Sequence, residues 1–185
     1  IPAEVSWTAG ALVEPFSCGY YAAQKADNLD ASDTVIVFGA GPIGLGVVAA
    51  ANAKGARVII AEPSQARIEV AKKLGAESSF DPSAADAVEQ AMKLTDGKGA
   101  TVVFEASGKP QAMAMTFQVA AFRARLVNIG INVGDSATAE LGLIQSKELQ
   151  VRGIIGSPGV WPETIRFLAK TGIDLSPLVT KQFDI

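Results

Sequence analysis

The chain has 185 residues, of which 49% are hydrophobic and 19% charged, and this fits one ordinary globular domain with a hydrophobic core. A formal net charge of -3 argues against a nucleic-acid-binding surface, and the single cysteine excludes a disulfide within the chain, so we expect a protein of the reducing cytoplasm. The sequence has no histidine, the commonest general acid or base, which leaves this chain few routes of its own for proton transfer.

The first predicted element is a helix over residues 9–26, and it contains Pro15. This helix precedes a repeating pattern, so we assign residues 1–30 to a connecting helical region. The chain begins at Ile1 rather than at a methionine, and we therefore expect it to be a fragment.

The repeating pattern alternates apolar, β-rich runs with helical stretches. The predicted strands are residues 34–38, 57–61, 78–81 (weak), 101–105, 125–129 and 149–155, and the predicted helices are residues 43–54, 64–74, 84–94 and 111–121. Ser64 and Ser83 are predicted N-caps, and Gly55 and Gly75 are predicted to follow helix C-termini. This alternation predicts an α/β fold over residues 31–156, a doubly wound parallel (Rossmann) sheet in three α/β/α layers.

The last part of the chain does not fit the alternation. Residues 161–171 predict a helix, and the sequence DLSPLVTKQFDI after it predicts a turn and a strand without a partner in this chain. We therefore assign residues 157–185 to a segment that leads toward a neighbouring domain.

The stretch VIVFGAGPIG begins a charge-free run over residues 35–51. A membrane-spanning helix needs about 20 apolar residues, and this shorter run is interrupted by Pro42 and several glycines, so we expect no membrane segment. The glycines instead form a GxGxxG motif between a predicted strand and a predicted helix. Gly39 would permit the tight turn, Gly41 would let the backbone approach a pyrophosphate, and Gly44 would let the helix pack against the strand.

The second strand ends in an acid, Glu62, placed to accept hydrogen bonds from both ribose hydroxyls of an adenosine. A carboxylate there repels a 2′-phosphate, which favours NAD, whereas Arg67 could pair with that phosphate and favour NADP. We prefer NAD. The alternative is that the glycines serve only packing and that Glu62 is a solvated strand end.

The order EPFSCGYYA, VIVFGAGPIGLG, VIIAEPSQARIEVAKKLGA, VVFEASG, LVNIGI and ELQVRGIIGS resembles the coenzyme-binding part of zinc-dependent medium-chain dehydrogenases, within them the sorbitol, butanediol and threonine dehydrogenase branch. The resemblance covers essentially the whole chain. It implies that zinc is held mainly by Cys, His and Glu side chains of an absent catalytic domain. Glu14 matches a glutamate near the metal, although a helix-terminal acid is the alternative for it.

The resemblance also implies further coenzyme contacts. Cys18 matches a small residue under the nicotinamide, Ser107 and Gly108 match the loop beside the adenosine, and two backbone stretches match those that hold the carboxamide. The full predicted coenzyme-binding set is Cys18, Gly39, Gly41, Pro42, Ile43, Gly44, Glu62, Arg67, Ser107, Ile129, Gly130, Ile131, Ile154, Ile155 and Gly156. Each of these could instead serve only core packing.

The resemblance implies an NAD-dependent, zinc-assisted dehydrogenase that oxidises a secondary alcohol or polyol, of which this chain alone is inactive. A non-catalytic dinucleotide-binding or redox-sensing module is one alternative, and a zinc-free quinone-reductase-like enzyme is another. The predicted edge strand from Leu149 to Ile155 is apolar, so we expect a homodimer or homotetramer through it.

Overall fold

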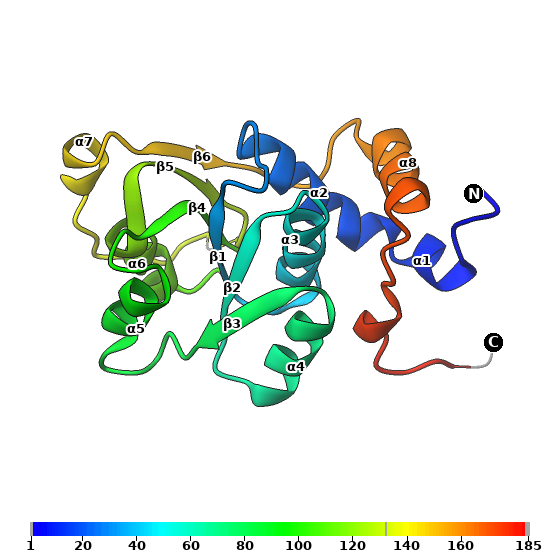
Figure 1. Ribbon diagram of the computed structural model, residues 1–185, viewed down its shortest axis with the longest axis horizontal. Coiled ribbons are helices and arrows are strands. Elements are labelled where there is room, and N and C mark those ends of the chain that lie inside the picture. The colour runs from blue at the N-terminus through cyan, green and yellow to red at the C-terminus, as the bar shows by residue number, and fades with distance from the viewer. Residues whose placement is uncertain (1, 132, 184–185) are drawn as a thin grey trace.

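The computed structural model describes residues 2–131 and 133–183, and all six strands in this part of the chain form one parallel sheet in the order β3-β2-β1-β4-β5-β6 (Figure 1). The strands are β1 (Thr34–Phe38), β2 (Arg57–Ala61), β3 (Ala76–Phe80), β4 (Ala100–Glu105), β5 (Ala120–Asn128) and β6 (Gln150–Gly153). This is the strand order of a doubly wound dinucleotide-binding fold, so the predicted fold class is confirmed.

Helices cover both faces of the sheet. They are α1 (Trp7–Ala11), α2 (Val13–Lys25), α3 (Pro42–Ala53), α4 (Gln65–Lys73), α5 (Ala87–Leu94), α6 (Pro110–Val119), α7 (Leu143–Ser146) and α8 (Trp161–Thr171), followed by a 3₁₀ turn over Ser176–Leu178. In Figure 1, α5 and α6 lie on one side of the sheet, and α2, α3 and α4 lie on the other. The three predicted layers are therefore present.

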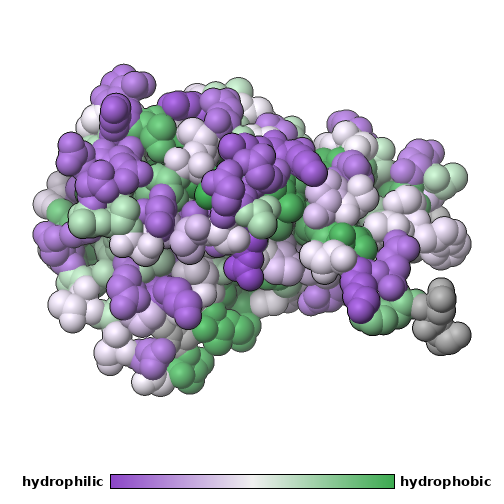
Figure 2. All heavy atoms as spheres, turned by 90° about the horizontal axis from the view of Figure 1, so that it is seen from below, coloured by the Kyte–Doolittle hydropathy of each residue, from purple (hydrophilic) through white to green (hydrophobic). Residues whose placement is uncertain are grey.

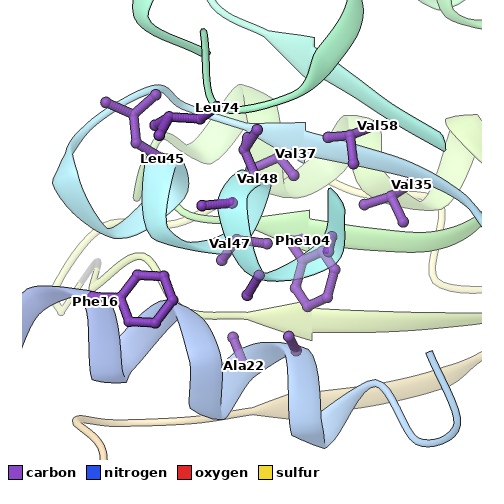
Figure 3. Packing of buried hydrophobic residues seen from close by; sticks show 14 of the residues in the cluster. Phe16, Ala22, Val35, Val37, Leu45, Val47, Val48, Val58, Leu74 and Phe104 are labelled. Atoms are coloured by element: carbon purple, nitrogen blue, oxygen red, sulfur yellow. The ribbon is translucent and has the colours of Figure 1, made fainter. Parts of the chain in front are cut away.

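The two faces of β1 feed two separate cores. Val35 and Val37 belong to the cluster shared with α2 and α3, whereas Ile36 and Phe38 belong to the cluster shared with α5 and α6. Successive side chains of a strand point to opposite faces, so a strand covered on both sides is apolar at every position. Figure 3 shows the first cluster, where Phe16 and Ala22 of α2 face Val47 of α3.

Helix α2 crosses α3 at backbone contact distance. A Cβ atom at Gly19 would lie 2.6 Å from the carbonyl carbon of Gly46, so any larger residue would push the helices apart. On its other side α2 packs against α8, where the rings of Tyr20 and Phe167 are 4.8 Å apart between centroids. Residues from all three predicted ranges thus share one hydrophobic core.

Two arginines from the sheet hold the C-terminal end of α2. Arg125 donates to the carbonyl oxygens of Ala26 (2.8 Å) and Asp27 and pairs with the buried Asp33. Arg152 donates to the carbonyl oxygen of Lys25 at 2.8 Å and pairs with the Asp27 carboxylate. Cations beside the last carbonyls of a helix are favourable, so β5 and β6 fix the position of α2.

Four predictions of local structure are wrong. Residues 120–121, predicted to end a helix, instead begin β5, which starts before its predicted first residue, 125. The single helix over residues 9–26 is two helices that meet at Leu12, because Pro15 lacks the N–H for the Ala11 carbonyl and its ring would clash with it. Ser83 is not an N-cap: α5 begins later, and the N–H and hydroxyl of Ser83 both donate to the Asp81 carboxylate (2.8 and 2.6 Å). The C-terminal strand does not form over residues 179–183, and residues 184–185 of that prediction lie outside the described part.

Other boundaries agree more closely. β1, β2 and α8 begin and end where predicted, and Gly55 and Gly75 follow helix ends with φ values of +87° and +107°. Ser64 is the N-cap of α4 by position, although its side chain makes no capping hydrogen bond. Within the described residues, no helix has the length and apolar character to cross a membrane. The face seen in Figure 2 mixes hydrophilic and hydrophobic residues.

Candidate functional site

A pocket of about 740 Å³ lies at the carboxyl ends of β1, β2 and β4. Gly39, Gly41, Glu62, Arg67 and Ser107, all predicted coenzyme contacts, line it. The strand order reverses between β1 and β4, and open α/β sheets bind ligands at such a point. Lys109, Met115, Pro82 and Ser83 complete part of its wall.

The three motif glycines occupy three different environments. Gly39 has φ of +93°, which favours glycine, and its N–H donates to the Ala61 carbonyl oxygen at 2.9 Å. A Cβ at Gly44 would lie 1.9 Å from the Gly39 carbonyl oxygen, so this residue allows α3 to pack against the turn. Gly41 is the N-cap of α3 with φ of -73°, and a Cβ there would meet nothing within 4 Å.

Unlike Gly39 and Gly44, Gly41 is not required to be a glycine by the protein's own structure. Its backbone angles suit any residue, and its side-chain space is open and faces the pocket. Pro42 opens the helix just after it, where a missing N–H costs nothing. The first N–H groups of a helix lack partners within the helix and carry partial positive charge, so this end of α3 suits an anionic group.

Glu62 is buried, and its residue is only 4% exposed. One carboxylate oxygen accepts from the N–H of Ala40 at 2.8 Å, and the other accepts from the N–H of Ser64 at 3.1 Å. The guanidinium of Arg67 lies 4.0 Å from the second oxygen. The alternative of a solvated strand end is therefore wrong. Glu62 both holds the glycine turn in place and lines the pocket.

Glu105 is a second buried carboxylate at the carboxyl edge, and sequence reasoning did not assign it a role. Its side chain accepts from the N–H and hydroxyl of Ser107 (2.9 and 2.5 Å) and from the N–H of Gly108 (3.1 Å). Its backbone oxygen accepts from the N–H groups of Ile129 (2.8 Å) and Gly130 (2.9 Å). An acid that ends an apolar strand before a Ser-Gly pair was the available signal.

The residues predicted to contact nicotinamide lie outside this pocket. Ile131 and Ile155 are 71% and 77% exposed, and Ile129 is partly buried against the first core cluster. Ile154 and Ile155 line a second depression of about 580 Å³ beside Tyr21 of α2. Gly156 follows these isoleucines with φ of +60°. Several residues predicted to bind the adenosine therefore line one pocket, whereas Ile131 and Ile155, predicted to bind the nicotinamide, lie at an open edge.

Cys18 and Glu14 both lie on α2. Burial raises the pKa of the Cys18 thiol, and the negative charge of Glu14 adds to this, although hydrogen bonds with Ser157 and Ser17 oppose it. The thiol is therefore protonated at neutral pH, which fits packing better than nucleophilic attack. Glu14 is exposed in the first turn of α2.

A zinc site does not fit within the described part of the chain. Residues 2–131 and 133–183 contain no group of three or more His, Cys, Asp or Glu side chains that could hold a metal ion. Catalytic zinc takes three protein ligands and keeps an open position, and Glu14 supplies one oxygen donor at most to such a set.

Comparison with known proteins gives a consistent result. Residues 42–170 match a family described as zinc-binding dehydrogenase. A sorbitol dehydrogenase of Bacillus subtilis is 32% identical over 100% of this chain and 52% of its own length. An (R,R)-butanediol dehydrogenase of Neisseria gonorrhoeae is 37% identical over 95% of this chain and 49% of its own length. The chain thus spans about half the length of the curated relatives it matches.

Solved structures agree with the fold. The 2R,3R-butanediol dehydrogenase of Bacillus subtilis aligns over 92% of this chain and 48% of its own with a TM-score of 0.83 and 34% identity. An alcohol dehydrogenase from Escherichia coli CFT073, solved with NADH, has a TM-score of 0.89 at 26% identity over 100% of this chain and 54% of its own. A protein described as a zinc-binding dehydrogenase from Sinorhizobium meliloti, bound to NADP, has a TM-score of 0.89 at 28% identity over 97% and 54%.

Proposed function

We propose that this chain, which belongs to the zinc-binding dehydrogenase family, is the coenzyme-binding part of an enzyme that oxidises a secondary alcohol or polyol with NAD. The observation that carries the proposal is Gly41. None of the described residues fills its side-chain space, its backbone angles need no glycine, and it faces the pocket at the start of α3. A ligand whose phosphates approach this backbone gives the glycine a reason.

The proposed roles follow from position in the fold. NAD supplies a nicotinamide ring that accepts hydride from the alcohol. Gly41, Pro42, Ile43 and Gly44 hold the pyrophosphate at the N-terminal end of α3, and Glu62 accepts the hydroxyls of the adenosine ribose. Ser107 borders the adenosine side of the pocket. Backbone groups of Ile129, Gly130 and Ile131, and of Ile154, Ile155 and Gly156, hold the carboxamide, with Cys18 packed below the ring.

NAD is preferred over NADP on electrostatic grounds. The Glu62 carboxylate is buried and held by two backbone N–H groups, so it cannot turn away from a 2′-phosphate without losing both bonds. Arg67 is an exposed side chain 4.0 Å from that carboxylate, and its charge is already partly matched there. Proteins similar to this chain are solved with either NADH or NADP, so the preference rests on Glu62.

We propose zinc for the whole enzyme, whereas the described residues of this chain do not form a zinc site by themselves. The described part of the chain has no metal-holding cluster, so the other ligands must come from elsewhere in that enzyme. In the whole enzyme, the zinc centre would lie near Glu14, in the first turn of α2 and four residues before Cys18.

We also propose a homodimer or homotetramer through the edge strand β6. Hydrogen bonds join β6 to β5 on one side, and its other edge ends the sheet. The backbone groups along this outer edge are a template for a second copy of the strand. β6 is shorter than the predicted strand over residues 149–155, and the exposed Val151 lies within it, whereas the exposed Ile155 lies just beyond its end. Sedimentation at micromolar concentration is expected to show a dimer or tetramer, and a monomer contradicts this proposal.

Calorimetric titration of the 185-residue chain tests the proposed function. We expect NAD to bind with one site per chain and NADP to bind more weakly. Assays with polyols and secondary alcohols in the presence of zinc are expected to show no turnover, because residues 2–131 and 133–183 contain no cluster that could hold a metal ion. Failure to bind NAD overturns the proposed function, and alcohol oxidation by the chain alone overturns its assignment as one part of an enzyme.

The non-catalytic dinucleotide-binding or redox-sensing module shares the same pocket and stays an alternative, as does a zinc-free quinone-reductase-like enzyme. The family match and the dehydrogenase relatives favour the enzyme, since their similarity extends over nearly the whole chain. These alternatives differ outside this chain, so the assay that separates them uses the natural protein with any adjoining sequence.

A further inference from the structure

Glu105 is a buried carboxylate that the proposed reaction does not use. Its residue is 0% exposed, and no lysine or arginine of the described residues forms an ion pair with it. A buried charge is costly unless hydrogen bonds compensate it. All of that compensation comes from Ser107 and Gly108, two residues of the loop that follows β4.

That loop touches the glycine turn on one side. A Cβ at Gly39 would lie 3.0 Å from the Cβ of Ser107, so the turn and the loop are in contact. Ser107 also lines the pocket, together with Gly41 and Glu62. The position of Ser107 therefore affects the adenosine side of the proposed site.

The same loop touches the nicotinamide side. A Cβ at Gly130 would lie 2.2 Å from the backbone nitrogen of Gly108 and 2.5 Å from a carboxylate oxygen of Glu105. A Cβ at Gly108 would lie 2.9 Å from the carbonyl oxygen of Ile131. The backbone oxygen of Glu105 also accepts from the N–H groups of Ile129 and Gly130. One residue is thus bonded to the loops after β4 and β5 at once.

We propose that Glu105 is a positioning residue that sets the loops after β4 and β5 in register, so that the adenosine and nicotinamide ends of the coenzyme are held together. It acts through Ser107, Gly108 and Gly130 and does not touch the reacting atoms. This inference rests on the proposed function. Its carboxylate is required because only an ionised acid offers acceptors alone, whereas an amide would direct N–H donors at N–H donors.

The test substitutes Glu105→Gln and compares it with Glu77→Gln, the same change at an exposed glutamate of β3. NADH affinity is expected to fall about tenfold in Glu105→Gln, because charge-assisted hydrogen bonds to the loop are lost. The emission of bound NADH at saturation is expected to lose its enhancement, since the nicotinamide is no longer held firmly. AMP affinity, measured by displacement of NADH, is expected to fall less than NADH affinity, because AMP keeps its contacts on the Glu62 side and loses only those that depend on Ser107.

A purely structural role for Glu105 makes a different forecast. In that case the folded fraction of Glu105→Gln binds NADH with wild-type affinity and wild-type emission, and the inference is overturned. Should wild-type protein bind no NADH, the proposed function fails first, which is a separate result. The exposed control Glu77→Gln is expected to match wild type in every measurement.

A second variant keeps the test decisive if Glu105→Gln does not fold. Gly130→Ala retains the carboxylate but places a methyl group 2.2 Å from the Gly108 nitrogen, which displaces the same loop from the opposite side. We expect the same pattern of weaker NADH binding, lost emission enhancement and a smaller loss of AMP affinity. Wild-type NADH binding by Gly130→Ala overturns the inference by itself.

Discussion

The two ends of the proposed coenzyme site differ in how much of the protein encloses them. At the adenosine end, Glu62 is 4% exposed and borders a 740 Å³ pocket with Gly41. At the nicotinamide end, Ile131 and Ile155 are 71% and 77% exposed. Large apolar side chains on an open surface commonly mark an interaction site. We therefore expect this chain to form the proposed adenosine end by itself, and we expect that end to supply most of the affinity for NAD.

The largest expected effect tests how closely the adenosine end is packed. Gly44→Ala would place a Cβ 1.9 Å from the Gly39 carbonyl oxygen and is expected to lower the free energy of unfolding by about 3 kcal/mol. Urea denaturation measures this change. Gly46→Ala is the matched control on the same helix, because its nearest new contact is an ordinary 3.5 Å and its cost should stay below about 1 kcal/mol. Equal losses in both variants would show that the close contact at Gly44 is not the cause of the lost stability.

Gly41→Ala separates the ligand from the fold. A Cβ there meets nothing within 4 Å, so the free energy of unfolding should change by less than about 0.5 kcal/mol. NAD affinity is expected to fall about tenfold, because the methyl group occupies the approach of the pyrophosphate. Titration calorimetry and denaturation of the same sample check both. Unchanged NAD affinity would contradict the proposed role of Gly41.

Glu62→Gln tests the buried charge at the adenosine end. NAD binding is expected to weaken by about 1 to 2 kcal/mol, because neutral hydrogen bonds replace charge-assisted ones to the ribose. NADP affinity should rise as the repulsion disappears, and Arg67→Ala in that background should remove much of the gain. Glu69→Gln, at an exposed position of α4, is the control. Equal dissociation constants for wild type and Glu62→Gln with both coenzymes would refute the ribose assignment.

The structure adds a second consequence for this variant. Glu62 accepts from the N–H groups of Ala40 and Ser64, and glutamine has one acceptor oxygen where the carboxylate has two. One of those N–H groups loses its partner, so a loss of about 1 to 2 kcal/mol in the free energy of unfolding should accompany the change in affinity.

The smallest effect is expected at the nicotinamide end. Ile155→Ser at a mostly exposed position should change the free energy of unfolding by less than about 0.5 kcal/mol and NAD affinity by less than about twofold. Denaturation and calorimetry of the isolated chain measure this. A tenfold loss of NAD affinity would contradict the proposed difference between the two ends, because the nicotinamide end of the isolated chain would then contribute strongly to binding.

The two central strands β1 and β2 could be predicted from sequence because their signal is strong. Residues 35–38 and 58–61 are apolar where the structure buries both faces, and the glycine motif indicated the start of α3. The acid at Glu62 stood out for the same reason, as a charge that ends an apolar strand. Its burial did not follow from the sequence, because the two N–H groups that compensate it come from the turn after β1 and from Ser64.

The other predictions failed because they depend on interactions between particular residues, which the pattern of apolar residues does not show. Asp81 binds both polar groups of Ser83, so Ser83 is not available to cap α5. Pro15 lies inside the predicted helix, but the helix is interrupted at Leu12, in the turn before the proline, and not at the proline itself. Glu105 was overlooked because its partners lie on the loops after two different strands.

The seating of α2 has a consequence for the order in which the chain folds. The hydroxyls of Ser17 and Ser157 share a hydrogen bond of 2.6 Å, and Gln24 donates to Glu163 at 2.8 Å. These partners are separated by 140 and 139 positions, so α2 leaves the ribosome long before they do. Closing so long a loop costs conformational entropy that local contacts do not repay. We therefore expect the docking of α2 against α8 to be among the last events in the folding of this part of the protein.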